Sequence, residues 1–419
     1  METKLGKVMV SDPVLFDICK REMKRQREGI EMIASESFVP EEVLELQGSI
    51  LSNKTTEGYV GKRYHAGCSV IDEMEALGID RAKQVYGAEH VNLQLHCGST
   101  SNQAVYFAVL EHGDTILGMS LDQGGHLTHG HRLNFSGQSY NFIEYGVKKD
   151  TETIDYDQIE ALAKEHSPKM IVAGASSYPR FIDYARIAKI AKSVGAYFLV
   201  DMAHVAGLVA AGVHPNPVPH ADFVTSTTTK TLAGARGGFI LCKEAYAKKI
   251  DRAVFPGVQG SPHLQTMAAK TFTFGRALTD EFKQYGQDVV ANAKALGEAM
   301  TERGFRLVSG GTDNHILLVD LRPKNLTGKQ FEKALESVGI TVNKNMIPFD
   351  PEKPMVSSGV RIGVAAMTIK GMRKDEMVKI ADMMQRVADH IEDETTLQQV
   401  AEDVSVLASG FPLYEGYIK

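Results

Sequence analysis

The sequence has few cysteines, no long hydrophobic run and no excess of basic residues. Its four cysteines, Cys19, Cys68, Cys97 and Cys242, lie far apart and form no CxxC pair, which argues against a disulfide framework or a zinc site. No segment approaches 18 consecutive apolar residues and the N-terminal segment lacks a signal-peptide core, so we expect a cytoplasmic protein. The net charge of -6 provides no broad basic field for nucleic acid, and no metal is predicted.

With 419 residues, the chain exceeds the usual size of one hydrophobic core, so a large domain and a smaller one are expected. Apolar segments of strand length alternate with helical patterns in the middle of the chain; they are residues 114–119, 170–176, 197–202, 223–227 and 237–242. The apolar spacing at 184–195 predicts a helix between two of them. This alternation is typical of an open α/β sheet with parallel crossovers.

The pattern changes after the last of these strands. Residues 263–304 have a helical pattern throughout, and the segments FRLVSGG, HILLVDL and GVRIGV with an amphipathic helix at 373–391 indicate a smaller α+β domain. The first 50 residues hold two helical patterns, so they form an arm that we expect to pack on a partner subunit. We therefore predict an N-terminal helical arm (1–50), a large α/β domain (51–280) and a small C-terminal α+β domain (281–419).

Three polar features lie where parallel sheets bind ligands, at the carboxyl ends of strands. Asp201 closes the strand YFLVD, with His204 three residues on, and Lys230 follows FVTSTTT. The third feature, residues 97–100 (CGST), follows HVNLQL and opens a helical stretch whose free N–H groups can bind a phosphate. Each feature alone is ordinary, because helix caps, turn aspartates and solvated lysines are common.

The combination of these features is more specific. An aspartate at one strand end, about 29 residues before a lysine at the end of a neighbouring strand, suits a pyridoxal phosphate site. The carboxylate keeps the pyridinium nitrogen protonated, and the amine forms an imine with the cofactor. Hydroxyls of the run Thr225–Thr231 can bond to the phosphate or relay protons.

A series of motifs extends over nearly the whole chain. They run from IEMIASESF at 30–38 through EGYVGKRYHAGC, GGHLTHG, GASSYPR, VDMAHVAGLVAAGVHP, TTKTLAGARGG, FPGVQG, LVSGGTDNH and VNKN to SGVRIG at 358–363. In this order they resemble the serine hydroxymethyltransferase family. The resemblance implies a fold-type I pyridoxal phosphate transferase with a mainly parallel, seven-stranded sheet. It also implies a homodimer, or a dimer of dimers, whose active sites are shared between subunits.

The resemblance further implies reversible transfer of a hydroxymethyl group between a serine-type amino acid and tetrahydrofolate, in one-carbon metabolism and glycine biosynthesis. The cofactor would be held by Lys230 as the Schiff-base lysine, by Asp201 at the ring nitrogen and by His126 stacked on the ring. Ser176 and His204 would contact its phenolic oxygen. The remaining predicted cofactor contacts are Gly98 and Ser99 at the phosphate, together with Gly260 and Ser261.

The substrate residues follow from the same resemblance. Ser35 and Arg361 would hold the substrate carboxylate, Arg361 through the two-pronged ion pair that a planar guanidinium makes well. His65 would also face the substrate, and Glu57 would be the acid–base residue near the departing hydroxymethyl group. The predicted folate pocket consists of Leu121, Gly125, His126, Leu127, Asn345 and Lys353.

Several positions depart from the usual family pattern. Thr55 and His65 stand where the family has tyrosines, and Thr229 stands where it has a histidine before the cofactor lysine. Further departures are Val60 for a proline, Ser261 for a glycine, and Ala233 and Ala235 for an arginine and a proline. The smaller threonines leave room for an additional methyl group on the substrate Cα, which a filled pocket would reject at a cost of about 1–3 kcal/mol.

Thr55, His65 and Thr229 also resemble the pattern of 2-methylserine hydroxymethyltransferases. The sequence therefore leaves two folate-linked reactions open, L-serine to glycine and 2-methylserine to D-alanine. A folate-independent aldolase or transaldolase for β-hydroxy amino acids is a third possibility, although it leaves Leu121 and Asn345 without a purpose. A non-catalytic, regulatory pyridoxal phosphate protein is a fourth, although the residues expected to perform the chemistry are retained.

Overall fold

A computed structural model describes residues 5–415 of the chain, which form two compact units. The first, here called the α/β unit, comprises residues 39–290. The second, here called the terminal unit, joins the N-terminal residues up to Phe38 to the residues from Ala291 onward. The predicted domain boundaries after residues 50 and 280 stay predictions. Among the described residues, we find no helix with the length and apolar character needed to cross a membrane.

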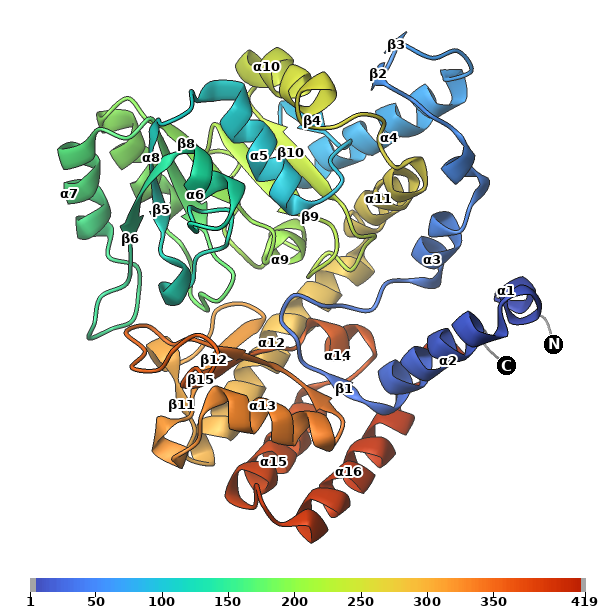
Figure 1. Ribbon diagram of the computed structural model, residues 1–419, viewed down its shortest axis with the longest axis vertical. Helices are drawn as coiled ribbons and strands as arrows, with labels where there is room; N and C mark the ends of the chain where they lie inside the picture. The colour runs from blue at the N-terminus through green and yellow to red at the C-terminus, as the bar shows by residue number, and fades with distance from the viewer. Residues whose placement is uncertain (1–4, 416–419) are drawn as a thin grey trace. The chain divides into compact units, whose positions relative to one another are not determined.

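The α/β unit is built on a seven-stranded sheet with the strand order β4-β10-β9-β8-β7-β5-β6 (Figure 1). The neighbours from β9 to β6 are parallel, whereas β10 is antiparallel to both β9 and β4. This confirms the mainly parallel α/β sheet. The strands are β4 (His90–Asn92), β5 (Thr115–Met119), β6 (Asn141–Tyr145), β7 (Met170–Gly174), β8 (Tyr197–Asp201), β9 (Phe223–Thr227) and β10 (Gly238–Cys242).

The apolar runs explain why these segments form the sheet. Strands β7 and β10 are buried at every position, as expected for strands that are covered on both faces. The direction of β10 reverses because residues 228–237, which join it to β9, contain no crossover helix. Asp201 pairs with Thr225 in the parallel ladder of β8 and β9, so these two strands end at the same edge of the sheet.

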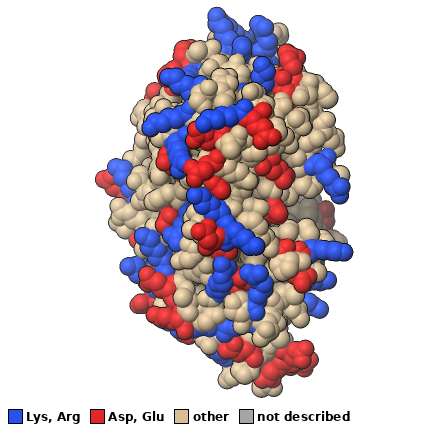
Figure 2. All heavy atoms as spheres, turned by 90° about the vertical axis from the view of Figure 1, so that its left-hand side faces the viewer, with Lys and Arg blue, Asp and Glu red and all other residues tan. Residues whose placement is uncertain are grey.

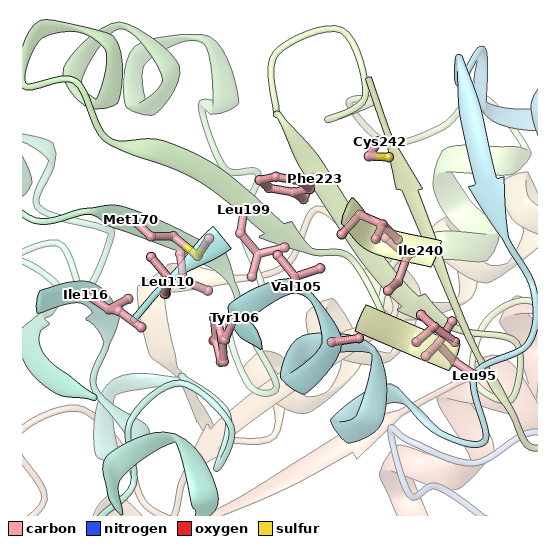
Figure 3. Close-up of a cluster of buried hydrophobic side chains, with 14 residues drawn as sticks. Leu95, Val105, Tyr106, Leu110, Ile116, Met170, Leu199, Phe223, Ile240 and Cys242 are labelled. Atoms are coloured by element: carbon pink, nitrogen blue, oxygen red, sulfur yellow. The ribbon is translucent and has the colours of Figure 1, made fainter. Parts of the chain in front are cut away.

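Helix α5 (Gly98–Val109) is fixed to the sheet by a cluster of buried apolar side chains (Figure 3). Val105 and Tyr106 of α5 pack in this cluster with Leu199 of β8 and Ile240 of β10. Burial of each such side chain contributes about 1.5–3 kcal/mol. The other helices of the α/β unit are α3 (Glu41–Gln47), α4 (Ser69–Tyr86), α6 (Phe135–Ser139), α7 (Tyr156–His166), α8 (Tyr184–Ser193), α9 (Ala206–Ala210), α10 (Ala247–Arg252) and α11 (Leu264–Ala277).

The continuous helical stretch predicted at 263–304 is wrong. The chain forms α11, which ends at Ala277, and then α12 (Asp280–Glu302). Thr279 lies at the break, where its Oγ1 accepts a hydrogen bond from Phe282 N at 3.3 Å. A threonine hydroxyl at this position satisfies a backbone donor of the first turn, so it favours a new helix start over a continued helix. The helix predicted at 184–195 forms as α8.

The terminal unit contains a four-stranded sheet, with the order β11-β12-β15-β14, and a parallel pair of β1 with β13. The predicted strands and the predicted amphipathic helix are present. Among residues 5–50, three α-helices begin where two helical patterns were predicted, namely α1 and α2 in this unit and α3 in the α/β unit. The elements are α1 (Gly6–Ser11), α2 (Pro13–Glu28), β1 (Ile30–Glu31), β11 (Arg306–Leu307), β12 (Ile316–Asp320), α13 (Gly328–Ser337), β13 (Ile340–Thr341), β14 (Asn343–Asn345), β15 (Gly359–Gly363), α14 (Ala365–Ile369), α15 (Lys374–Asp389) and α16 (Glu394–Ser409).

The surface and the cysteines agree with the composition. On the face drawn in Figure 2, Lys and Arg side chains are interspersed with Asp and Glu, and neither sign forms a broad field. All four cysteines are free.

Candidate active site

A cavity lies at the carboxyl ends of β7, β8 and β9 within the α/β unit. It brings together most of the residues that the sequence predicts for the cofactor. Its lining consists of Cys97, Gly98, Ser99, His126, His129, Ala175, Ser176, Asp201, Ala203, His204, Thr227, Thr229, Lys230, Arg236 and Gly237.

Asp201 is the last residue of β8, and three neighbours fix its carboxylate. Oδ2 accepts a hydrogen bond from Asn102 Nδ2 (2.9 Å) and contacts His129 Nε2 (3.2 Å), and Oδ1 accepts one from Ala203 N (3.1 Å). Burial alone would raise the pKa of Asp201, but the hydrogen bond and the electrostatic interaction with His129 hold this pKa well below its ordinary value. Asp201 therefore presents a negative charge to the cavity.

Lys230 lies in the loop that follows β9, next to the end of β8. Its side chain is half-buried and lines the cavity beside His204, which is buried. The backbone of the His204 loop is tied to the Lys230 loop, because Thr231 Oγ1 donates a hydrogen bond to His204 O at 2.9 Å. Ser176 enters the same cavity from the segment after β7, where its N donates to Gly124 O at 2.8 Å.

The start of α5 forms an anion-binding wall of the cavity. Cys97 at the N-cap makes no side-chain capping bond, so the first N–H groups of the helix are not occupied by a cap. A Cβ atom at Gly98 would lie 2.7 Å from Thr227 Cγ2, which leaves space only for glycine. Thr227 Oγ1 is buried and has no hydrogen-bond partner among residues 5–415. These donors fit the phosphate of pyridoxal phosphate. The amine of Lys230 and the carboxylate of Asp201, in the same cavity, fit its ring.

His126 lies in the loop after β5 and is half-buried. Its Nδ1 is 2.7 Å from Thr128 Oγ1 and accepts a hydrogen bond from Thr128 N at 3.2 Å. One ligand atom each from His126, His129 and Asp201 lies within 4.8 Å of the others, a spacing that a metal ion would also accept. All three residues line the cavity that fits the cofactor, so this cluster is part of the same site.

The prediction that the hydroxyls of Thr225–Thr231 serve the cofactor is wrong for three of them. Thr225 Oγ1 donates to Asn102 Oδ1, Thr228 Oγ1 donates to Ala235 O, and Thr231 Oγ1 donates to His204 O. Among the hydroxyl-bearing side chains of this run, only Thr227 and Thr229 line the cavity. The hydroxyls of Thr228 and Thr231 instead hold the loop around Lys230 in place, and that of Thr225 connects β9 to α5.

Glu57 belongs to a second cluster of predicted residues, which lies elsewhere in the α/β unit. It precedes the short strands β2 (Gly58–Tyr59) and β3 (Lys62–Arg63). Glu57 N donates to His65 Nδ1 at 3.5 Å, and Thr56 N donates to Ser261 Oγ at 2.9 Å. A Cβ atom at Gly260 would lie 3.5 Å from Glu57 Oε1. Thr55 and His65 are exposed.

This second cluster does not line the cavity around Lys230 in the described part of the chain. We call it the Glu57 cluster; it consists of Thr55, Glu57, His65, Gly260 and Ser261. The other departures from the family pattern lie at Val60, which is exposed, and at Ala233 and Ala235, which are buried.

The predicted carboxylate-binding residues lie in the terminal unit. Arg361 is in β15, where its Nε donates to Asn343 Oδ1 at 3.2 Å, and burial lowers its pKa to about 10. Ser35 follows Ala34, which packs against β15 so closely that a Cβ atom at Gly363 would lie 2.3 Å from Ala34 Cα. The structure thus places Ser35 and Arg361 on adjoining segments of one unit.

The predicted folate residues come from two places. Leu121 and Leu127 are exposed in the loop that carries His126, and Gly125 is buried there against Met119 O. Asn345 is at the end of β14, and Lys353 is exposed in the loop that follows, both in the terminal unit. Exposed leucines beside a polar cavity suit a flat, partly apolar ligand.

Sequence reasoning missed several residues around Asp201. His129 is three residues after His126, and Asn102 is three residues after Ser99 on the same face of α5. Arg236 also lines the cavity, and no sequence pattern indicated it. The helical spacing from Ser99 to Asn102 was the signal that could have identified Asn102.

One protein family model, described as serine hydroxymethyltransferase, matches residues 8–384, which is most of the chain. Enzymes of this family are fold-type I transferases that use pyridoxal phosphate, with tetrahydrofolate as co-substrate, in one-carbon metabolism. The seven-stranded sheet, and the lysine and aspartate at adjacent strand ends, agree with that membership. The chain therefore belongs to the serine hydroxymethyltransferase family, whose members perform pyridoxal phosphate-dependent hydroxymethyl transfer.

Proposed function

We propose that this protein transfers the hydroxymethyl group of 2-methylserine to tetrahydrofolate and releases D-alanine. The observation that supports this choice is the position of Thr229. It lines the cavity directly beside Lys230, at a position where the family pattern has a histidine. A threonine there leaves space for the additional methyl group on the substrate Cα. L-Serine is the alternative substrate, since the smaller molecule also fits a widened pocket.

Pyridoxal phosphate, when bound, supplies an electron sink that allows the Cα–Cβ bond of the substrate to break. Lys230 would hold the cofactor through its amine, and Asp201 would keep the ring nitrogen protonated. His126 would stack on the ring, and Ser176 and His204 would orient it through the phenolic oxygen. The remaining proposed cofactor contacts are Gly98 and Ser99 at the phosphate, with Gly260 and Ser261.

The substrate and folate roles extend this proposal. Arg361 and Ser35 would bind the substrate carboxylate, and an anion there would offset the cost of burying the Arg361 guanidinium. Glu57 would move a proton at the oxygen of the departing hydroxymethyl group. The folate co-substrate would be bound by Leu121, Gly125, Leu127, Asn345 and Lys353.

We further propose that the Glu57 cluster completes the cavity of a second copy of the chain, as a homodimer with shared active sites requires. Two observations support this. None of the cluster's residues lines the Lys230 cavity of its own chain, within residues 5–415. The same stretch of chain also exposes large apolar side chains, with Ile50, Tyr64 and Val70 at 84%, 77% and 72% exposure. Such side chains are typical of surfaces that another subunit covers.

The test is a side-by-side assay of the cofactor-loaded protein with 2-methyl-L-serine and with L-serine, each with and without tetrahydrofolate. We expect folate-dependent D-alanine as the dominant product. Dominant, folate-dependent glycine would instead identify a serine enzyme with a widened pocket. Products that form equally well without folate would identify an aldolase. Absence of both products, with the cofactor bound, would contradict the proposed reaction.

Homodimer formation has its own test. Mixtures of two inactive variants, K230A and E57Q, should recover part of the activity if each cavity uses Glu57 of the other subunit, because a mixed dimer contains one intact site. No recovery after subunits have exchanged would contradict the shared site.

A further inference from the structure

We propose that Asn102 is a positioning residue that fixes Asp201 and His126 together, so that the partner of the ring nitrogen and the stacked imidazole keep one relative geometry. This inference rests on the cofactor roles proposed above for Asp201 and His126. Asn102 does not line the cavity, and it acts only through the residues that do.

The Asn102 amide is fully buried, and hydrogen bonds account for each of its polar atoms. Nδ2 donates to Asp201 Oδ2 at 2.9 Å and to Thr128 Oγ1 at 2.7 Å. Oδ1 accepts from Thr225 Oγ1 at 2.5 Å. The opposite amide orientation would place a carbonyl oxygen against the Asp201 carboxylate, so the two donors must face Asp201 and Thr128.

The direction of the remaining bonds follows from these two donors. Thr128 Oγ1 accepts from Asn102, so its own proton is available for His126 Nδ1 at 2.7 Å. Thr128 N also donates to His126 Nδ1 at 3.2 Å, and a backbone N–H can only donate. His126 Nδ1 is therefore an acceptor, and the imidazole carries its proton on Nε2. A directed chain of hydrogen bonds thus runs from Asn102 to the His126 ring.

Helix α5 sets the distance between this series of hydrogen bonds and the anion-binding wall. Ser99 at the cavity and Asn102 are three residues apart, so they lie on the same face of the helix. Three residues correspond to a rise of about 4.5 Å along the helix. Because the apolar cluster around Val105 and Tyr106 holds α5 on the sheet, the helix relates the phosphate end of the site to Asp201 at a fixed spacing.

A purely structural role is the competing explanation, because removal of any buried amide leaves its partners unsatisfied. Asn292 provides the matched control. It is also fully buried, and its Nδ2 donates to Thr368 Oγ1 at 2.9 Å and to Met372 O at 3.0 Å, in the terminal unit. A general loss of folding stability should be similar in N102A and N292A, whereas an effect on the cofactor should appear in N102A alone.

The experiment measures the affinity of the apoprotein for pyridoxal phosphate, the visible absorbance of the bound cofactor from pH 6 to pH 10, and the thermal unfolding of the apoprotein. The proteins are wild type, N102A, N292A, T128V and the double variant N102A/T128V. We expect N102A to weaken cofactor binding by about 10- to 100-fold, as loss of a hydrogen bond to a buried charged group does. N102A should also alter the pH dependence of the absorbance, and N292A should change neither quantity.

T128V should weaken binding less than N102A, because it breaks only the branch toward His126. In the double variant, the fold-loss of cofactor affinity should be smaller than the product of the two single losses, since both substitutions break the same series of hydrogen bonds. Equal cofactor affinity in N102A and N292A, or independent effects of N102A and T128V, would overturn the inference. Failure of the wild-type protein to bind pyridoxal phosphate would instead contradict the proposed function, which keeps the two outcomes separate.

Discussion

The Lys230 cavity and the Glu57 cluster are built in different ways. In the cavity, the polar groups lie at strand ends, at the start of α5 or in the loops that follow strands, and Asp201 is held by three neighbours. In the Glu57 cluster, the residues lie in segments that flank the short β2–β3 hairpin and in the loop before α11, and single hydrogen bonds connect them. The cavity is therefore rigid within one chain, whereas the Glu57 cluster depends on few local contacts.

This difference suggests how the chain divides its tasks. A cofactor that serves every reaction of the family needs a carboxylate and an amine at a fixed separation, which adjacent parallel strands provide. Residues that select one substrate can change with little effect on folding when they are exposed. Of the three departures linked to the additional methyl group, Thr55 and His65 are in the Glu57 cluster and Thr229 is in the cavity.

The variant E57Q should distinguish the two regions most clearly, because it should change catalysis but not cofactor binding. Removal of the acid–base carboxylate should lower kcat by about 10²- to 10⁴-fold, because proton transfer at the substrate loses its donor and acceptor. Cofactor affinity and thermal stability should change little, since the Glu57 side chain is outside the cavity of its own chain. Steady-state kinetics and cofactor titration provide the measurements. E73Q, which removes an exposed carboxylate nearby on α4, is the matched control. A large loss of cofactor affinity in E57Q alone would contradict this separation.

D201N should, in contrast to E57Q, change cofactor affinity strongly. Loss of the buried charge should weaken pyridoxal phosphate binding by about 10²- to 10⁴-fold, since breaking a buried ion pair costs about 3–5 kcal/mol. The pH dependence has a definite sign. The pKa of Asp201 is held below its ordinary value of 3.8, so its charged form stabilises the apoprotein above about pH 4, and this contribution is lost as the pH falls further. Denaturant unfolding of the apoprotein at pH 7 and pH 3 should therefore show a smaller difference between wild type and D201N at pH 3. An unchanged difference would refute that account of Asp201.

Sequence reasoning performed unequally in the two regions, for physical reasons. The strands β8 and β9 end where their apolar runs end in the sequence. Asp201 and Lys230 could therefore be predicted to lie close together. The direction of each hydroxyl after β9 depends on the conformation of a loop in which even Ala233 has a positive φ of 49°, and no sequence period describes that. The break at Thr279 was missed because the apolar pattern continues through it, although the hydroxyl caps a new helix.

T229H tests whether the cavity itself selects the substrate. An imidazole beside Lys230 should fill the proposed space for the Cα methyl group, at a cost of about 1–3 kcal/mol. We therefore expect kcat/KM for 2-methyl-L-serine to fall about tenfold or more relative to that for L-serine. T229S keeps both the hydroxyl and the space, so it should preserve the preference. Equal losses for both substrates in T229H would show that position 229 does not discriminate between them.

The smallest expected effect comes from S261A, which tests how firmly the Glu57 cluster is held. The Ser261 hydroxyl accepts its bond from Thr56 N, between Thr55 and Glu57, so its removal frees the segment that positions both side chains. A net contribution of about 0.5–1.5 kcal/mol corresponds to at most about a tenfold change in kcat. S261T retains a hydroxyl acceptor for Thr56 N, so its kcat should be close to that of the wild type and higher than that of S261A. Because the Ser261 hydroxyl holds the segment of Glu57 and makes no bond to Asp201, S261A should affect kcat more than it affects the absorbance of the bound cofactor. The reverse pattern would mean that Ser261 acts mainly through its proposed contact with the cofactor and little through the position of Glu57.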